Sequence, residues 1–248
     1  MNILLTNDDG YLADGFQALY KKLKGEYSLY VCAPTTQKSS VSHAVSLFKP
    51  LKYIEVDDGF AVDGTPSDCI KIALHGFFKE TKFDLIVSGI NNGINMGHDI
   101  YYSGTVAGAR EAEMNNISGI ACSKNWDGKY KEFSTSADFM LSFIRKSEKL
   151  IKKEKVFLNI NFPAVKEFKG AKLTHLGNRI YNNTIYFEEK NNEKFVSIVG
   201  DALKFDKDEG SDLDCVSENY VSITPLSGTK ACYDPRLNEE ISSCITSI

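Results

Sequence analysis

Short apolar runs alternate with amphipathic segments through the first two-thirds of the chain, and this order constrains the fold more than any other feature. Residues 3–5 and 27–33 are apolar runs typical of buried strands. Between them an apolar face at helical spacing begins at Phe16, and Asp14 with Gln17 predicts a capping box at its start. A strand, helix, strand order of this kind predicts a parallel βαβ unit.

The same order repeats up to Pro163. Thr65 followed by Pro66 and Asp68 predicts a capped helix start. The remaining apolar and periodic segments predict a strand at 85–87, a helix at 105–114, a strand at 119–122, a helix at 133–153 and a strand at 156–161. We therefore predict an α/β fold built on a doubly wound, mostly parallel sheet.

The sequence changes character after Pro163. Residues 184–204 are rich in aromatic and β-branched side chains, with Asn191-Asn192 as a turn, and predict a long β-hairpin. Residues 219–224 predict a strand, and residues 238–244 a short helix. We expect residues 1–163 to form the α/β core and residues 164–248 a C-terminal extension within the same globular unit. Because the hairpin has few partners in its own chain, a homo-oligomer is expected.

Composition excludes several classes of partner. The 248 residues are 42% hydrophobic and carry a net charge of -4, with no basic arm or face, so no nucleic-acid partner is expected. No stretch is long enough to span a membrane, and the N-terminal apolar run is too short for a signal peptide. None of the six cysteines forms a CxxC pair. We expect a cytoplasmic protein with reduced thiols and no membrane partner.

Four polar segments follow the predicted strands, where open α/β sheets bind ligands. The first, residues 6–10, places Asp8 beside Asp9. Adjacent carboxylates repel each other, and a hard divalent cation relieves that cost, although Asp-Asp-Gly is also ordinary turn chemistry. The second, residues 33–40, offers hydroxyls and one lysine and by itself reads as a flexible loop.

The other two segments are more specific. Residues 88–97 are rich in Gly and Asn, which permits close backbone approach to a ligand, and Asn91 offers a neutral oxygen. Residues 102–106 open a helix of small residues, where free N–H groups attract anions and the hydroxyls of Ser103 and Thr105 add donors, although Thr105 is also a suitable N-cap. Together the four segments predict a metal beside an anion site, which is typical of phosphoryl chemistry. His43 and His98 follow two of these loops, and a surface position is expected for both.

An ordered set of motifs resembles the SurE proteins, a family of survival-protein nucleotidases. The matching segments run in family order along nearly the whole chain, at residues 3–10, 63–69, 88–91, 102–106, 159–163 and 220–226. The chain departs from the family pattern in two segments. The loop of residues 35–40 reads Thr-Thr-Gln-Lys-Ser-Ser, without the family's arginines and with Ser40 in place of a glycine, and His175 follows Thr174 where the family has arginine.

The resemblance implies a Rossmann-like fold whose C-terminal segments are exchanged between subunits in dimers or tetramers. It implies hydrolysis of nucleoside 5′- or 3′-monophosphates with one Mg²⁺ or Mn²⁺ per subunit, and a side activity on short polyphosphate. Its metal ligands map onto Asp8, Asp9, Ser39 and Asn91. Its phosphate-side residues map onto Ser103, Gly104 and Thr105, with Asn95 nearby.

Our mechanistic hypothesis is metal-assisted attack of water on phosphorus, with Asp8 and Asp9 as the catalytic carboxylates. One alternative is an aspartyl-phosphate intermediate on Asp8, as in haloacid-dehalogenase-type phosphatases, although that family separates its two acids by one residue. The other alternative is a nucleotide sensor that binds without hydrolysis.

Overall fold

The structure is a computed structural model that describes residues 1–126, 130, 132–205 and 207–227. The predicted helix at 238–244 and two of the cysteines, Cys232 and Cys244, lie outside these residues. The four cysteines inside them are free and buried, as expected. In the described part of the chain, no helix has the length and apolar character needed to cross a membrane.

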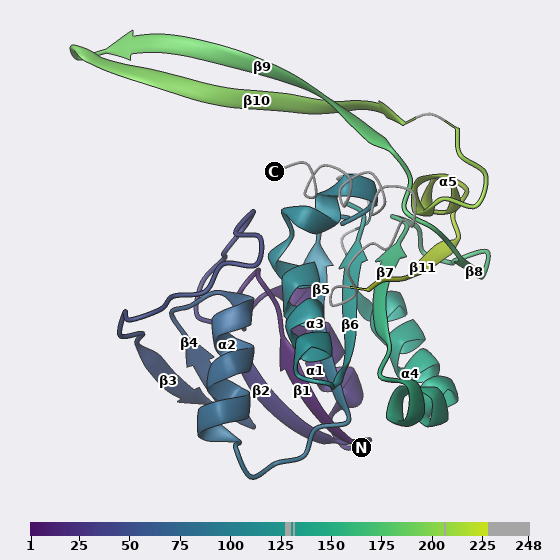
Figure 1. Cartoon of the computed structure of the whole chain (residues 1–248). Coiled ribbons are helices and arrows are strands. Elements are labelled where there is room, and N and C mark those ends of the chain that lie inside the picture. Colours follow the sequence, from purple (N-terminus) through teal and green to yellow (C-terminus); the bar gives the residue numbers. More distant parts are fainter. Residues whose placement is uncertain (127–129, 131, 206, 228–248) are drawn as a thin grey trace, which may run out of the picture.

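A nine-stranded sheet forms the centre of the molecule, in the order β3-β4-β2-β1-β5-β6-β7-β11-β8 (Figure 1). Most neighbouring strands are parallel, and the antiparallel pairs are β3 with β4 and β7 with β11. The strands are β1 Asn2–Thr6, β2 Ser28–Pro34, β3 Tyr53–Val56, β4 Gly59–Val62, β5 Leu85–Asn92, β6 Ser118–Lys124, β7 Phe157–Phe162, β8 Ala171–Leu173 and β11 Val221–Pro225.

Helices cover both faces of this sheet, which confirms the predicted doubly wound α/β fold (Figure 1). Side chains of β1 point alternately to the two faces of the sheet. Ile3 and Leu5 pack in the hydrophobic cluster that includes residues of α1 and α4, whereas Leu4 packs in the cluster on the opposite face, which includes residues of α2. The helical segments are α1 Asp14–Leu23, α2 Pro66–Ile72, the π-helical turn η1 Ala73–Phe77, the 3₁₀ turn η2 Gly97–Tyr101, α3 Gly104–Met114, α4 Ser134–Glu154 and α5 Asp212–Ser217.

Several local predictions were wrong or incomplete. The capping box at Asp14 is absent: the N-cap is Ala13 without a side-chain hydrogen bond, and Gln17 donates instead to the carbonyl of Tyr11 over 2.7 Å. The capping box of Thr65 and Asp68 is present as predicted. The hairpin of β3 and β4, the short strand β8 and helix α5 were not predicted.

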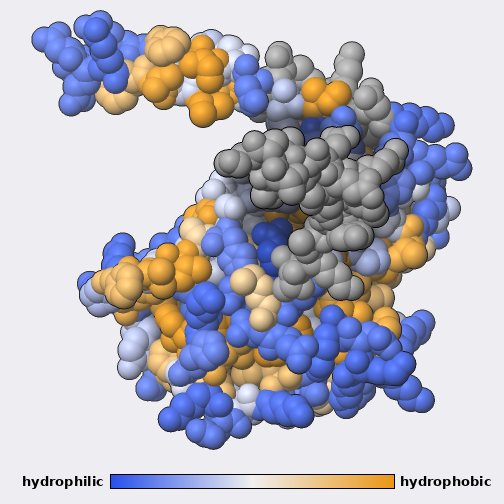
Figure 2. Space-filling view, viewed as in Figure 1, coloured by the Kyte–Doolittle hydropathy of each residue, from blue (hydrophilic) through white to orange (hydrophobic). Residues whose placement is uncertain are grey.

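The predicted hairpin exists and is longer than expected. Strand β9 (Arg179–Lys190) pairs with β10 (Glu193–Phe205), and the two form a separate sheet that projects from the body of the molecule (Figure 1). Asn191 and Asn192 make the turn with φ of 53° and 63°, which suits the tight turns of hairpins. Apolar side chains line the projecting arm (Figure 2); among them Phe187 is 81% exposed.

Candidate metal and phosphate site

The candidate site lies where the strand order reverses around β1. Along the chain, β2 and β4 are added on one side of β1, and β5, β6 and β7 on the other. Thr6, the last residue of β1, pairs with Ser88 of β5. A crevice at the carboxyl ends of two such strands is the usual ligand site of open α/β sheets. The structure therefore places residues 6–10 and 88–92 side by side at this point.

Asp8 lies under the N-terminus of α3. Its Oδ1 accepts a hydrogen bond from the buried hydroxyl of Thr105. Ser103 is the N-cap, and its Oγ accepts from the N–H of Val106 over 3.1 Å. Thr105 is therefore not the N-cap, and its hydroxyl is directed at Asp8 instead of being free for an anion. The N–H of Gly104 has no hydrogen-bond partner among the described residues.

Burial makes the ionised form of Asp8 unfavourable. The side chain is 6% exposed, and this burial raises its pKa from 3.8 to about 6. The hydroxyl of Thr105 acts in the opposite direction, and the charge of Asp9 raises the pKa further. Asp8 is thus a carboxylate whose ionised form has no counter-charge among the described residues.

Asp9, in the turn after β1, and Asn91, at the end of β5, lie on neighbouring segments. The N–H of Asn92 donates to Asp9 Oδ2 over 2.8 Å, and burial raises the pKa of Asp9. Asn91 Nδ2 donates to the carbonyl of Gly93 over 2.7 Å, and Asn91 Oδ1 carries no hydrogen bond among the described residues. Asn91 and Asn92 lie at the end of β5, which extends to Asn92 with a register irregularity after Ser88. The expected end of the strand at residue 87 was therefore wrong.

Ser39 belongs to the loop that joins β2 to β3. The N–H of Lys38 donates to the carbonyl of Asp8 over 2.7 Å, which brings this loop against the Asp8 turn. Ser39 itself is exposed, and its Oγ accepts from Gln37 Nε2 over 2.8 Å. The neighbouring Ser40 has a φ of 54°, a left-handed conformation that glycine adopts more readily.

Asn95 is held by a buried polar network. Its N–H donates to Asn161 Oδ1 over 2.9 Å, its Nδ2 donates to Ser123 Oγ over 2.8 Å, and its carbonyl accepts from Asn159 and Asn161. Asn95 Oδ1 has no partner among the described residues. Its side-chain oxygen is therefore the atom left for contact with a ligand.

The oxygen atoms gathered here fit a hard divalent cation. Next to Asp8, the buried Asn7 Oδ1 has no hydrogen-bond partner, and neither do Thr6 Oγ1 and Ser88 Oγ, within the part of the chain that is described. No three His, Cys, Asp or Glu side chains of that part come together as a metal-binding group. A cation would therefore be held by two carboxylates and neutral oxygens, the donors that Mg²⁺ and Mn²⁺ prefer.

The raised pKa of Asp8 predicts how Mn²⁺ binding depends on pH. Because the cation needs the ionised carboxylate, binding releases a proton once the pH falls below the pKa of about 6. We expect the affinity of the metal-free protein for Mn²⁺ to be constant above this pH and to fall by about tenfold per pH unit below it. Electron paramagnetic resonance of free Mn²⁺ measures this, and an affinity that does not change between about pH 5 and pH 8 would contradict the role of Asp8.

Gly104 lets α3 approach Asp8. A Cβ atom at this position would lie 3.0 Å from Asp8 Cβ, 3.1 Å from Asp8 Oδ2 and 3.1 Å from Val41 Cγ2. Gly104→Ala should displace the Asp8 carboxylate by a few tenths of an ångström. We expect kcat/KM for the predicted phosphate hydrolysis to fall about tenfold, because a larger misplacement of about 1 Å costs about 10²-fold. Gly76→Ala is the matched control, because nothing lies within 4 Å of its added Cβ. Equal kcat/KM values for the two variants would contradict this geometry.

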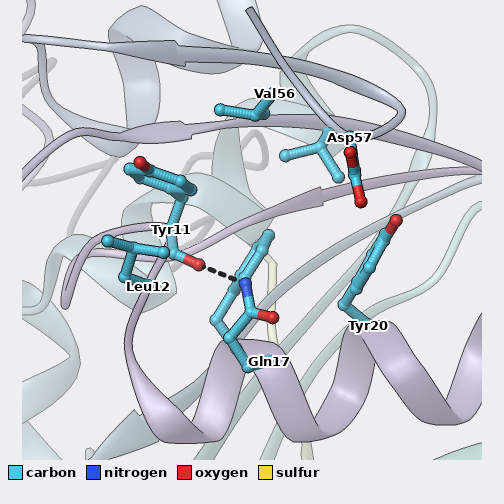
Figure 3. A pocket seen from close by; sticks show the side chains of 8 residues that line it. Tyr11, Leu12, Gln17, Tyr20, Val56 and Asp57 are labelled. Atoms are coloured by element: carbon cyan, nitrogen blue, oxygen red, sulfur yellow. Dashed lines mark hydrogen bonds between the residues drawn. The ribbon is translucent and has the colours of Figure 1, made fainter.

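A pocket of about 280 Å³ opens on the other face of the sheet, between α1 and the turn that joins β3 to β4 (Figure 3). Tyr11 and Leu12 form one wall, and Val56 and Asp57 the opposite wall. Tyr11 is fixed at both ends of its backbone, since its N–H donates to the carbonyl of Pro34 over 2.9 Å and its carbonyl accepts from Gln17. These two hydrogen bonds anchor the chain that leaves the Asp8-Asp9 turn.

Two further residues near the site carry contacts that sequence reasoning missed. His43, expected at the surface, lies with Nε2 2.8 Å from Oε2 of Glu111, which is 1% exposed. Glu111 lies on α3 about two turns after Gly104. The only sequence signal is a glutamate on the buried face of a helix of small residues.

This arrangement defines an α/β protein with an acidic oxygen site beside a helix N-terminus at the reversal point of its sheet. The family model for survival protein SurE matches residues 3–183. The chain belongs to the SurE family.

Named relatives cover nearly the whole chain. A 5′-nucleotidase SurE of Campylobacter jejuni subsp. doylei is 39% identical over 90% of this chain and 90% of its own length. A 5′-nucleotidase SurE of Kosmotoga olearia is 38% identical over 97% of this chain and 98% of its own. The crystal structure of the SurE protein from Aquifex aeolicus superimposes with a TM-score of 0.84 at 32% identity, covering 98% of this chain and 99% of that one.

Proposed function

We propose that this chain is a metal-dependent 5′-nucleotidase, a phosphomonoesterase that hydrolyses nucleoside 5′- and 3′-monophosphates to nucleoside and phosphate. The observation that carries the proposal is the buried Asp8 carboxylate, held by Thr105 under the N-terminus of α3 with a pKa raised to about 6. Its relatives of 36–39% identity over most of the chain are named 5′-nucleotidases.

One divalent cation, Mg²⁺ or Mn²⁺, belongs to this site in our proposal. Asp8, Asp9 and Asn91 hold it, and Ser39 completes the set from the neighbouring loop. When bound, the cation neutralises negative charge on the phosphate and polarises the bond to be broken. Without that charge, a phosphate dianion at the start of α3 would face the carboxylates of Asp8 and Asp9.

The N-terminus of α3 receives the phosphate. The free N–H of Gly104 and the positive end of the helix dipole attract the anion. The Ser103 hydroxyl accepts from Val106 and still has its own proton to donate. In our proposal Thr105 acts through its backbone and through Asp8, and Asn95 Oδ1 contacts the ribose side.

Hydrolysis follows from these positions. Asp8 orients a water molecule and accepts its proton while the water oxygen bonds to phosphorus. The bond from phosphorus to the ribose oxygen breaks on the opposite side, and the ribose oxygen leaves with the electron pair of that bond and takes up a proton from solvent water. The charge of Asp9, which is fixed by the N–H of Asn92, favours the protonated form of Asp8, and a cation that neutralises both carboxylates would keep Asp8 ionised.

The chain is proposed to act in the cytoplasm as a homodimer or homotetramer. The apolar side chains of the hairpin arm support this, since a partner would cover them (Figure 2). Residues 1–163 supply every proposed ligand, and residues 164–248 supply the arm and two strands at the edge of the sheet. Short polyphosphate is a proposed side substrate.

The test is phosphate release from a panel of nucleoside 5′- and 3′-monophosphates and tripolyphosphate, with Mn²⁺, with Mg²⁺ and with EDTA. Metal-dependent release from the nucleotides supports the proposal and ranks the substrates. Nucleotide binding without release would instead indicate a sensor. A labelled phosphoenzyme trapped by acid quench would indicate the aspartyl-phosphate route on Asp8.

A further inference from the structure

The loop of residues 35–52 carries Ser39 but has an unfavourable backbone. Ser40, Ser42 and Phe48 all have left-handed φ values, of 54°, 52° and 59°. Residues with a Cβ adopt this conformation at a cost in free energy, so the surrounding structure must hold it. Because Ser39 is itself exposed, its position depends on the anchors of its neighbours.

Contacts of the residues after Ser39 tie the loop to the start of α3. The N–H of Ser42 donates to the carbonyl of Tyr102 over 3.0 Å, and Ser42 Oγ donates to the carbonyl of Tyr101 over 2.6 Å. The next residue, His43, places Nε2 2.8 Å from Glu111 Oε2. The loop thus lies over the helix end that is proposed to receive phosphate.

Glu111 is a buried charged anchor for this loop. Besides His43, its carboxylate accepts from Lys71 Nζ over 2.7 Å and from Asn115 Nδ2 over 3.0 Å. Burial acts to raise the pKa of Glu111, but the hydrogen bonds from His43 and Lys71 outweigh it and lower the pKa below its usual value. A buried carboxylate with all these partners is held rigidly.

We propose that Glu111 is a positioning residue that acts through His43 to hold Ser39 at the metal site. The inference rests on the proposed metal function for the role of Ser39, but not for the placement of the loop. Without the contact between His43 and Glu111, the strained segment at residues 40–42 loses an anchor. Ser39 is then held less firmly and contributes less to the ligand set, although Lys38 and Ser42 keep their hydrogen bonds. Asp8 and Asp9 stay in place after β1, and Asn91 stays in place on β5.

Lys71 offers a matched control. It contacts the same carboxylate as His43, but it lies on α2 and not on the loop. Lys71→Ala therefore removes a Glu111 partner and leaves the loop anchor in place. His43→Gln keeps a side-chain donor that can reach the carboxylate, and it serves as the conservative rescue.

The experiment measures Mn²⁺ affinity by paramagnetic resonance and amide hydrogen exchange of residues 35–46 in the metal-free protein. We expect His43→Ala to weaken Mn²⁺ binding about tenfold, in line with other residues that orient metal ligands, and to speed exchange in the loop. Lys71→Ala should change the affinity by less than about twofold and leave loop exchange as in the unmodified protein. His43→Gln should recover most of both properties.

Equal effects of His43→Ala and Lys71→Ala on both readouts would overturn the inference, because they would indicate a general loss of stability. Unchanged affinity and unchanged exchange in His43→Ala would overturn it as well. If the unmodified protein binds no Mn²⁺, the proposed metal function fails instead. The exchange comparison then still decides whether Glu111 and His43 hold the loop.

Discussion

Asp8→Asn should lower turnover of a nucleoside 5′-monophosphate by at least about 10²-fold while the protein remains folded. The substitution removes the charge that the cation needs and the base that orients water, and positioned bases alone contribute about 10²–10⁴-fold. It preserves the shape of the side chain, and the new amide oxygen can still accept the hydrogen bond from Thr105. Phosphate release at saturating Mn²⁺ measures the loss.

The stability of this variant separates lost chemistry from lost folding. The pKa of Asp8 is about 6 in the folded protein and 3.8 in its unperturbed state, so the folded state binds a proton more tightly. Ionisation of this carboxylate therefore destabilises the metal-free protein progressively as the pH rises from about 4 to about 6, and the cost of about 3 kcal/mol stays constant at higher pH. We expect metal-free Asp8→Asn to unfold at the same or a higher temperature than the unmodified protein at pH 8. Near-normal turnover, or unfolding of the variant, would contradict the assignment.

Thr105→Val should weaken Mn²⁺ binding and lower kcat/KM by about 10- to 10²-fold. Valine has the shape of threonine but lacks the hydroxyl that donates to Asp8, and hydrogen bonds to charged groups contribute about 1.5–3 kcal/mol. The hydrogen bond from Thr105 lowers the pKa of Asp8, so its removal should raise that pKa above about 6. The pH below which Mn²⁺ binding weakens should therefore move upward. Mn²⁺ titrations at several pH values measure both effects.

Thr105→Ser is the control for this prediction. Serine keeps the donor and loses only a methyl group at a fully buried position. Its Mn²⁺ affinity and pH profile should stay close to those of the unmodified protein, with a moderate loss of stability from the small cavity. If the valine and serine variants bind Mn²⁺ alike at every pH, the hydroxyl of Thr105 does not hold Asp8.

The arrangement of the sheet was predictable because it depends on burial. Residues 3–5 and 85–87 are continuous apolar runs, and a strand covered by helices on both faces has this pattern. Sequence order with right-handed crossovers then places their carboxyl ends together. That reasoning located the segments of Asp8 and Asn91 without any knowledge of their contacts.

Other features depend on contacts between residues far apart in the sequence. The role of Thr105 was misjudged because local capping chemistry suits Thr105 and Ser103 equally, and only the position of Asp8 decides between them. The link from His43 to Glu111 joins a loop to a helix that follows three strands later. The end of β5 was placed too early because Gly-rich sequence favours a loop, whereas pairing with β6 continues to Asn92.

The most direct test of the account follows phosphate release from a nucleoside 5′-monophosphate by the unmodified protein as Mn²⁺ is removed with EDTA and then restored. We predict that release stops in EDTA and returns with Mn²⁺, and that Asp8→Asn stays at least about 10²-fold slower than the unmodified protein at every Mn²⁺ concentration. Release that continues undiminished in EDTA, or that Mn²⁺ restores equally in Asp8→Asn, would contradict a metal-dependent nucleotidase centred on Asp8.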